Sequence, residues 1–228
     1  WSTIELLKKE RDLVGIYLSA HPLDEYSVVL NSMCNLRCDQ LTRDMDKQEL
    51  AKTAELTFGG IVSSVTSRFT KNNKPFGIVT IEDFNGQGEL ALFGDEWTKW
   101  QHMLKEEYIV YITATMRQRF ANAPNSLELV IKSVEFMNDV KDKRIERFTI
   151  YIDSTLLHNS RMNDLEVLLK SNPGNVPLYF NIHDSEHNTD LTLLSHNTTI
   201  DPSKKLLNFL DDLNNETEEH ETVRYAIN

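Results

Sequence analysis

Basic and aromatic side chains gather in two short stretches of this 228-residue chain. Lysine and arginine neutralise phosphates, and aromatic rings stack on nucleic-acid bases without regard to their order. The two stretches together predict a surface for single-stranded nucleic acid. The alternative is that the two lysines are solvated turn residues and the first two phenylalanines belong to the core. The candidate residues are Arg68, Phe69, Lys71, Lys74, Phe76, Arg117, Arg119 and Phe120.

The overall charge opposes this interpretation, because the formal net charge is −11 and phosphate binding needs a local excess of bases. The charge is uneven, however. Residues 208–228 hold six acids and one base, whereas residues 58–137 hold nine acids and eight bases. We therefore expect weak, salt-sensitive binding over the near-neutral part. The acidic end would repel DNA and suits solvent or a basic protein partner.

The residues that could carry catalysis or bind a metal ion do not occur at the spacings that catalysis or metal binding requires. Cys34 and Cys38 lack a second ligand pair at zinc spacing, and His183 and His187 fall across a predicted hairpin turn. Glu82-Asp83 is the only acidic pair near a strand end, which is too few acids for two-metal chemistry. The sequence also lacks a nucleophile elbow and a Walker loop. We predict no catalysis, no metal and no cofactor.

Hydropathy with a period of two predicts five strands from Leu56 onward, with one helix between the third and the fourth. Asp95 is the expected N-cap of that helix, and Trp97 and Trp100 share its apolar face. This order is that of an OB barrel, in which the first-to-second and fourth-to-fifth loops flank the binding face. The candidate residues fall on those two loops. The predicted strands are Leu56–Phe69, Phe76–Phe84, Gly88–Phe93, Tyr108–Arg117 and Ser126–Phe136.

A second unit follows a charged stretch. Its predicted order, β-α-β-β-α-β, indicates a small two-layer sandwich. Asp201 is expected to cap the second helix, with Pro202 as the first helical residue. The strands and the first helix are expected at Phe148–Asp153, Ser160–Ser171, Val176–His183, Asp190–Ser195 and Thr222–Ile227.

The fold class is therefore α+β, an OB barrel followed by the sandwich, with a helical lead-in. We expect a lead-in and joint over residues 1–53, the OB domain over 54–138, an exposed linker over 139–147 and the C-terminal domain over 148–228. The two cysteines do not suggest a disulfide framework, and no apolar run approaches the roughly 20 residues that span a bilayer. These features predict a cytoplasmic protein without a membrane contact.

The segment from Glu10 to Leu23 resembles the joint before the OB domain in bacterial replicative DNA polymerase III α subunits. Tyr17-Leu18-Ser19-Ala20-His21-Pro22-Leu23 carries most of this likeness, with Ala20 where the family usually has glycine. Further similar motifs follow in the family's order. They are Gly60-Ile61-Val62, Lys71–Pro75, Thr80–Asp83, Glu89–Phe93, Gly174–Leu178 and Asp201–Leu207.

This resemblance implies a parent DNA-directed DNA polymerase whose catalytic palm domain lies upstream of this chain, so that the fragment itself is no enzyme. It implies an OB domain near single-stranded template DNA and a C-terminal domain that docks the clamp loader's tau subunit. The sliding clamp and the rest of the polymerase are further implied partners. Two alternatives stay open: a protein-interaction scaffold without nucleic-acid contact, and a tRNA-binding OB domain of a synthetase. The C-terminal α/β unit argues against the latter.

Overall fold

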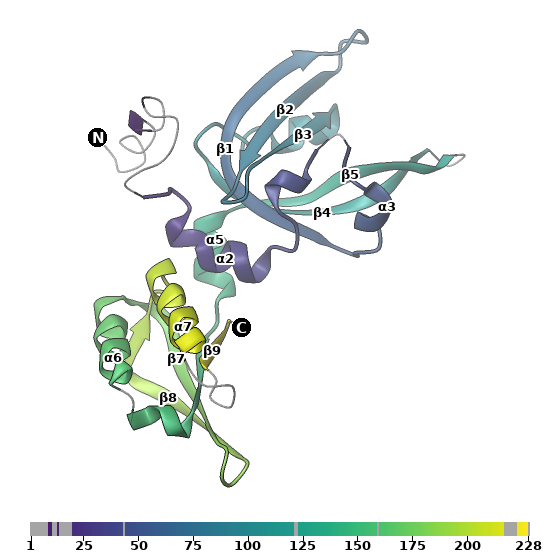
Figure 1. The fold of residues 1–228 in the computed structure, drawn as a ribbon. Helices are drawn as coiled ribbons and strands as arrows, with labels where there is room; N and C mark the ends of the chain where they lie inside the picture. The colour runs from purple at the N-terminus through teal and green to yellow at the C-terminus, as the bar shows by residue number, and fades with distance from the viewer. Residues whose placement is uncertain are drawn as a thin grey trace. The chain divides into compact units, whose positions relative to one another are not determined.

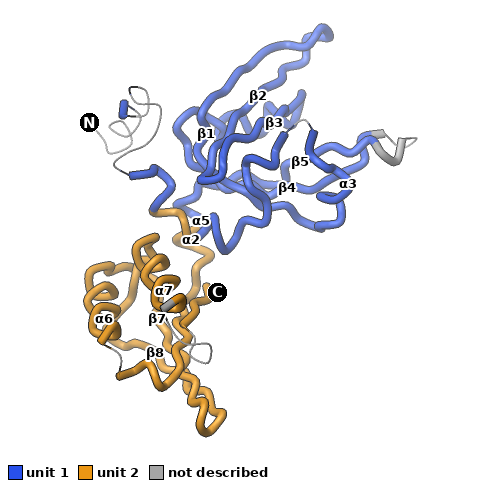
Figure 2. Tube along the Cα trace, viewed as in Figure 1, with its two compact units in different colours: residues 1–24, 29–140 blue, residues 25–28, 141–228 orange. Residues whose placement is uncertain are grey.

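A computed structural model describes residues 9–10, 13, 20–42, 44–120, 123–158, 160–216 and 223–227. The first part of the expected helical lead-in, residues 1–19, therefore lies almost wholly outside the described residues. The chain forms two compact units, residues 1–24 with 29–140 and residues 25–28 with 141–228 (Figure 2). Each unit has a sheet of its own.

Five strands form the sheet of the first unit, in the order β3-β2-β1-β4-β5 (Figure 1). All neighbouring pairs are antiparallel. The helix α4 stands between the third and fourth strands, so the predicted OB fold is confirmed. The bounds are β1 Leu56–Phe69, β2 Pro75–Glu82, β3 Gln87–Phe93, α4 Asp95–Trp100, β4 Ile109–Phe120 and β5 Ala123–Phe136.

Strand β1 serves two halves of this sheet. Its first part, from Leu56 to Ile61, pairs with β4, and its second part, from Ile61 to Phe69, pairs with β2. The chain needs glycine near the change of partner, because a Cβ on Gly60 would lie 2.1 Å from the carbonyl oxygen of Glu82. The core is built on the inward side by Phe58, Val79, Ile81, Leu92 and Ile112, all buried.

Helix α4 packs on the core of the sheet through its apolar face, as predicted. Trp97 is only 3 % exposed, and Trp100 is partly buried against the same cluster. The N-cap prediction was wrong: Gly94, not Asp95, occupies that position, at φ +56°. Glycine suits this backbone, because a side chain rarely adopts a positive φ.

The polar connection before β1 packs more closely than its composition suggests. It contains η1 Asp24–Tyr26, α2 Ser27–Met33, η2 Cys38–Gln40 and α3 Lys47–Leu50. Cys38 and Leu41 are buried in the core of the sheet. The buried Asp83 fixes this arrangement, because its carboxylate accepts hydrogen bonds from the backbone N–H of Cys38 at 2.8 Å and of Asn85 at 2.7 Å.

The stretch 139–147, expected as an exposed linker, is largely helical. Helix α5 runs over Met137–Arg144. Its Met137 and Val140 are buried, and so is Ile145 beyond its end. The difference has a simple cause: apolar residues three apart share one helical face, and the many charged residues between them hide this short pattern.

The second unit has a four-stranded sheet in the order β8-β7-β6-β9, with β6 and β7 parallel. The predicted β-α-β-β-α-β order is confirmed. Pro202 was wrongly expected as the first residue of α7: the helix begins at Lys204, and the Ser203 hydroxyl accepts from the N–H of Leu206 at 3.3 Å. The bounds are β6 Phe148–Asp153, η3 Ser154–His158, α6 Arg161–Ser171, β7 Pro173–Asp184, β8 Thr189–Ile200, α7 Lys204–Glu216 and β9 Val223–Ile227.

We propose that residues 54–138 and 148–228 are domains that fold independently, because each sheet has its own buried cluster. Polypeptides of residues 20–146 and 141–228, which both contain residues 141–144 of α5, should each be soluble and melt in one cooperative step. Circular dichroism melts of the two pieces and of the whole chain test this. Loss of ordered structure in both isolated pieces would contradict the division.

Candidate nucleic-acid interface

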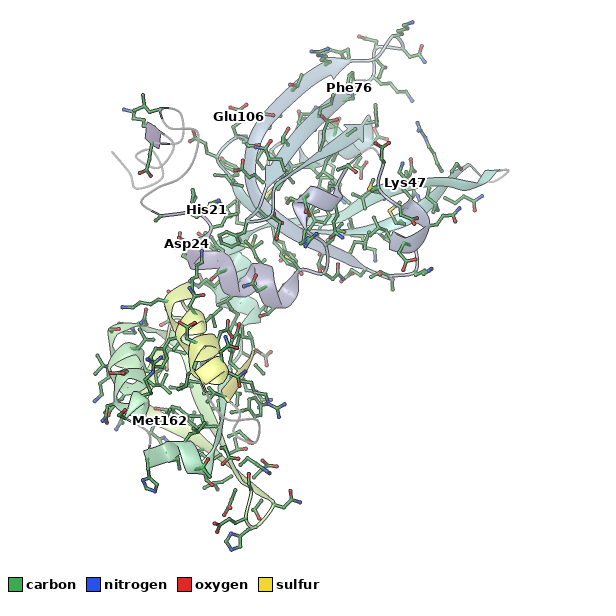
Figure 3. The ribbon with its side chains drawn as sticks, in the orientation of Figure 1. His21, Asp24, Lys47, Phe76, Glu106 and Met162 are labelled. Carbon is green, nitrogen blue, oxygen red and sulfur yellow. The ribbon has the colours of Figure 1, made fainter. Side chains whose placement is uncertain are left out.

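A row of three side chains crosses the outer face of β1, β2 and β3. Arg68 pairs with Phe76, and Phe76 pairs with Phe93, so the three point to the same side of the sheet. The two rings stack with their centroids 5.6 Å apart and an interplanar angle of 18°. Phe93 is 53 % exposed. We call this row the platform; Figure 3 shows Phe76 on the β1–β2 hairpin.

The other predicted residues of this hairpin lie elsewhere. Phe69 neighbours Arg68 in β1 and so points to the opposite face, where it is 68 % exposed. Lys71 and Lys74 are exposed in the turn at the tip. That turn is closed by a hydrogen bond from the N–H of Thr70 to the carbonyl oxygen of Lys74 at 2.8 Å. The structure therefore brings Arg68 and Phe76 together and separates Phe69 from them.

The second predicted group lies in a strand and not in a loop. Arg117, Arg119 and Phe120 belong to β4, which ends three residues later than the alternation indicated. The side chain of Phe120 lies outside the described part of the structure. Both arginines pair with Glu128 of β5: Arg117 Nη2 lies 3.3 Å from Oε1, and Arg119 Nε lies 3.6 Å from Oε2.

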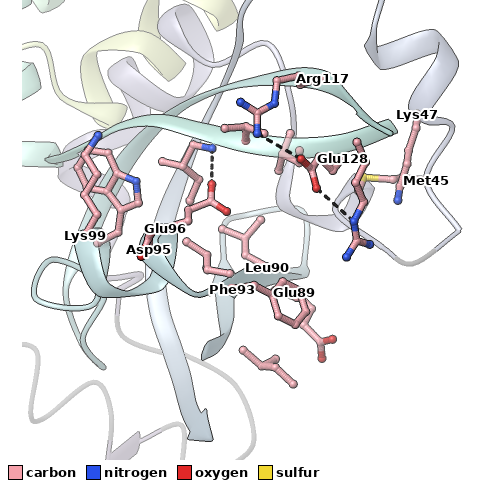
Figure 4. A pocket seen from close by; sticks show the side chains of 18 of the residues that line it. Met45, Lys47, Glu89, Leu90, Phe93, Asp95, Glu96, Lys99, Arg117 and Glu128 are labelled. Carbon is pink, nitrogen blue, oxygen red and sulfur yellow. Dashed lines mark hydrogen bonds and ion pairs between the residues drawn. The ribbon is translucent and has the colours of Figure 1, made fainter. Parts of the chain in front are cut away.

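A cleft of about 660 Å³ separates β3 from this β4–β5 arm (Figure 4). Ile78 of β2 and Phe93 of the platform are among the residues that line it. The charged residues that line it are evenly matched, with four bases and four acids. They are Lys47, Lys99, Arg117, Arg119, Glu89, Asp95, Glu96 and Glu128.

Glu96 occupies part of the gap where β3 and β5 fail to pair. Its carboxylate accepts a hydrogen bond from the backbone N–H of Ile131 at 2.8 Å (Figure 4). Burial raises the pKa of Glu96, although the hydrogen bond to Ile131 acts in the opposite direction. This side chain thus satisfies a strand-edge donor that a closed barrel would pair with β3.

Residues missed by the sequence reasoning complete the cleft. Phe93 is the clearest, and a signal for it existed: Leu90 and Leu92 alternate with Glu89 and Ala91, so Phe93 continues the outward-facing series. Lys47 and Lys99 come from α3 and α4, and nothing in their local sequence indicates that they line a shared cleft.

The two cysteines are free, with Cys38 buried. Burial raises the pKa of the Cys34 thiol to about 12, and burial likewise raises that of Cys38, with the nearby Asp83 carboxylate adding to both shifts. Both are therefore neutral thiols near pH 7. Among the described residues, no group of three or more His, Cys, Asp and Glu could hold a metal ion.

The second unit has an apolar groove of about 280 Å³ between α6 and the sheet. Leu193 of β8 lies at this groove and is 44 % exposed. Leu191, which is also exposed, is paired with Ile182, whose side chain lines the groove as well. The lining residues are Ile152, Leu157, Met162, Leu165, Glu166, Leu169, Phe180, Ile182 and Leu193.

Two family models match the chain. Residues 56–137 match the OB-fold nucleic acid binding domain, and residues 148–228 match the DNA polymerase III alpha subunit, C-terminal domain. The family match thus agrees with the OB fold of the first unit.

Curated relatives extend the second match. The DNA polymerase III subunit alpha of Pseudomonas fluorescens is 26 % identical over 208 residues, 91 % of this chain and 17 % of that protein. The Escherichia coli subunit is 24 % identical over 211 residues, 92 % of this chain and 18 % of that protein. Residues 148–228 therefore match the model of the C-terminal domain of the DNA polymerase III alpha subunit, and about nine-tenths of the chain is similar to part of that subunit in these relatives. It spans less than a fifth of the length of these relatives.

Among solved structures, a mitochondrial single-stranded DNA binding protein from S. cerevisiae covers 36 % of this chain and 92 % of that chain, at 16 % identity. The TM-score of 0.27 is too low for this likeness to bear on function. Among the described residues, no helix is both long enough and apolar enough to cross a membrane.

The outer platform depends on the core beneath it. A Cβ on Gly77, between Phe76 and Ile78, would lie 2.3 Å from Cε3 of Trp97. Gly77→Ala should therefore lower the free energy of unfolding by about 1–3 kcal/mol through overpacking. Urea unfolding at equilibrium measures this. Thr66→Ala, at an exposed position on the outer face, is the control and should stay within about 0.5 kcal/mol. If Gly77→Ala left the free energy of unfolding unchanged, α4 would be able to shift away from β2 at little cost.

Proposed function

We propose that this chain is a non-catalytic C-terminal part of a replicative DNA polymerase III alpha subunit, whose OB domain binds single-stranded template DNA weakly. Its C-terminal domain docks the clamp loader's tau subunit. The sliding clamp and the rest of the polymerase are partners of the parent protein, which acts in the cytoplasm. The relatives support this assignment by name, and the matched region lies within a small share of their length.

The platform is the observation that carries DNA binding. Phe76 and Phe93 offer two stacked rings on an open sheet face, and Arg68 stands at the end of the same row. Exposed aromatic rings stack on bases of any kind, and a neighbouring guanidinium binds the adjacent phosphate. Such a surface favours single strands over duplex, because duplex bases are already stacked on one another.

The other predicted basic residues are consistent with a strand that crosses this platform. Lys71 and Lys74 at the hairpin tip, and Arg117 and Arg119 across the cleft, supply charge on two sides of a strand that crosses the face. The four acids of the cleft offset its four bases. We therefore expect affinity that is weak and that falls with added salt.

A protein-interaction scaffold without nucleic-acid contact is the alternative. The balanced charge of the cleft favours it, since proteins that bind nucleic acids usually present an excess of bases. Direct binding measurements decide between the two.

The groove beside α6 is the surface that we propose for tau. Its apolar lining and the exposed leucines of β8 resemble the buried centre of a protein interface more than a solvated surface. Met162 of α6 and Leu193 of β8 both line it.

Replacement of Phe93 by alanine should weaken binding of a fluorescent 20-mer single strand at least about fivefold, because a stacked aromatic contributes about 1–3 kcal/mol. Fluorescence anisotropy at two salt concentrations measures this.

Phe69→Ala is the matched control, since it removes another exposed ring, 68 % against 53 % for Phe93, from the opposite face of the sheet. A larger loss for Phe69 than for Phe93 would place the DNA on that other face. If the unmodified chain shows no binding at low salt and high micromolar concentration, the scaffold alternative replaces the DNA-binding proposal.

Leu193→Lys should weaken the complex with purified tau subunit about tenfold or more, because a charge would be buried in an apolar contact. Isothermal titration calorimetry provides the affinity. Val167→Lys, on α6 but outside the groove lining, is the control and should change little. Equal affinities for the two variants and the parent chain would exclude the groove as the docking surface.

A further inference from the structure

We infer that Glu128 sets the strength of nucleic-acid binding in the cleft, by competing with DNA phosphate for Arg117 and Arg119. This inference rests on the proposed function and names a residue that limits it. The family matches assign no role to this carboxylate.

The geometry is that of one acid shared by two bases. Arg117 Nη2 and Arg119 Nε lie 3.3 and 3.6 Å from the two different carboxylate oxygens of Glu128 (Figure 4). Arg117 and Glu128 are directly paired across β4 and β5, and Arg119 follows on the same face of β4. All three side chains line the same cleft.

The competition follows from the chemistry of the groups. A carboxylate and a phosphate both accept charge-assisted hydrogen bonds from guanidinium, through similar oxygen atoms. A phosphate that enters the cleft must therefore displace Glu128 from an arginine, or must accept the repulsion of a neighbouring carboxylate. The arginine side chains are 66 % and 58 % exposed, so the pairs are screened and displacement costs little. Glu128 should thus weaken binding without abolishing it.

The other acids of the cleft are less suited to this role. Glu96 accepts a hydrogen bond from the backbone N–H of Ile131, so its carboxylate already has a partner. Glu89 and Asp95 belong to β3 and α4, not to the β4–β5 arm that carries the two arginines. Glu128 is the acid whose removal changes the charge that the β4–β5 arm presents.

Glu128→Gln keeps the shape of the side chain and removes its charge. In anisotropy titrations with a 20-mer single strand, this variant should bind about two- to fivefold more tightly than the parent chain at low salt. The dependence of log K on log salt should become steeper by up to about 0.7 for each arginine that gains a phosphate contact. Glu55→Gln is the matched control: Glu55 pairs with Lys132 at 3.5 Å, outside the cleft lining, and its removal subtracts the same charge.

A double-mutant cycle separates competition from a general charge effect. Arg117→Ala should cost less than about twofold in affinity when Glu128 is present, and about fivefold in the Glu128→Gln background, because only there is the guanidinium released for phosphate. Thermal melts of each variant establish that the fold is kept.

Each outcome decides the matter. Equal effects of Glu128→Gln and Glu55→Gln, or an additive cycle, would overturn the competition while leaving the proposed function in place. Weaker binding by Glu128→Gln would show that the acid orients the arginines for DNA, the opposite role. Absence of binding by both the parent chain and Glu128→Gln would overturn this inference and the proposed function together.

Discussion

The first unit depends on one constraint, which is that strand β1 pairs with two different strands. One continuous strand pairs with β4 along its first half and with β2 along its second, so the two half-sheets diverge from a common line near Ile61. Gly60 permits the close approach to the backbone of Glu82 that this divergence requires. The β1–β2–β3 face and the β4–β5 arm consequently stand apart, and the cleft occupies the space between them. A larger residue at Gly60 would prevent this close approach and would so change the spacing between the two sides of the cleft.

The electrostatics of the cleft give the proposed site its character. Four bases alone would form a strong, salt-sensitive funnel for phosphate, whereas the four matching acids reduce the field that a distant strand experiences. Stacking on Phe76 and Phe93 is short-ranged and insensitive to this balance. A surface that binds mainly by stacking, with its bases offset by acids, would hold a single strand weakly and release it readily. Such binding would suit the proposed contact with a template strand that moves past the protein.

Alternation in the sequence predicted strands such as β3 well, because their residues are buried and exposed in turn. The ends of the strands and the faces of individual residues could not be obtained that way. Arg117 and Arg119 were expected in a loop, yet β4 continues past them because β5 offers paired partners such as Glu128. Phe93 was missed because its place beside Phe76 depends on the β2–β3 register. Helix α5 was missed because the charges of its sequence outnumber Met137 and Val140.

The platform and the core are one residue apart along β2, and this spacing separates binding from stability. Phe76 and Ile78 face outward, while Gly77 and Val79 face inward, with Gly77 against the ring of Trp97 and Val79 fully buried. An outward substitution removes a contact with ligand and leaves the packing of α4 intact. An inward one moves Trp97 and with it the position of β2, so that binding is lost only as a consequence of the strain. Trp97 of α4 packs in the core against Gly77, directly beneath the platform. A residue of the core can therefore determine the position of a binding surface without contacting the ligand.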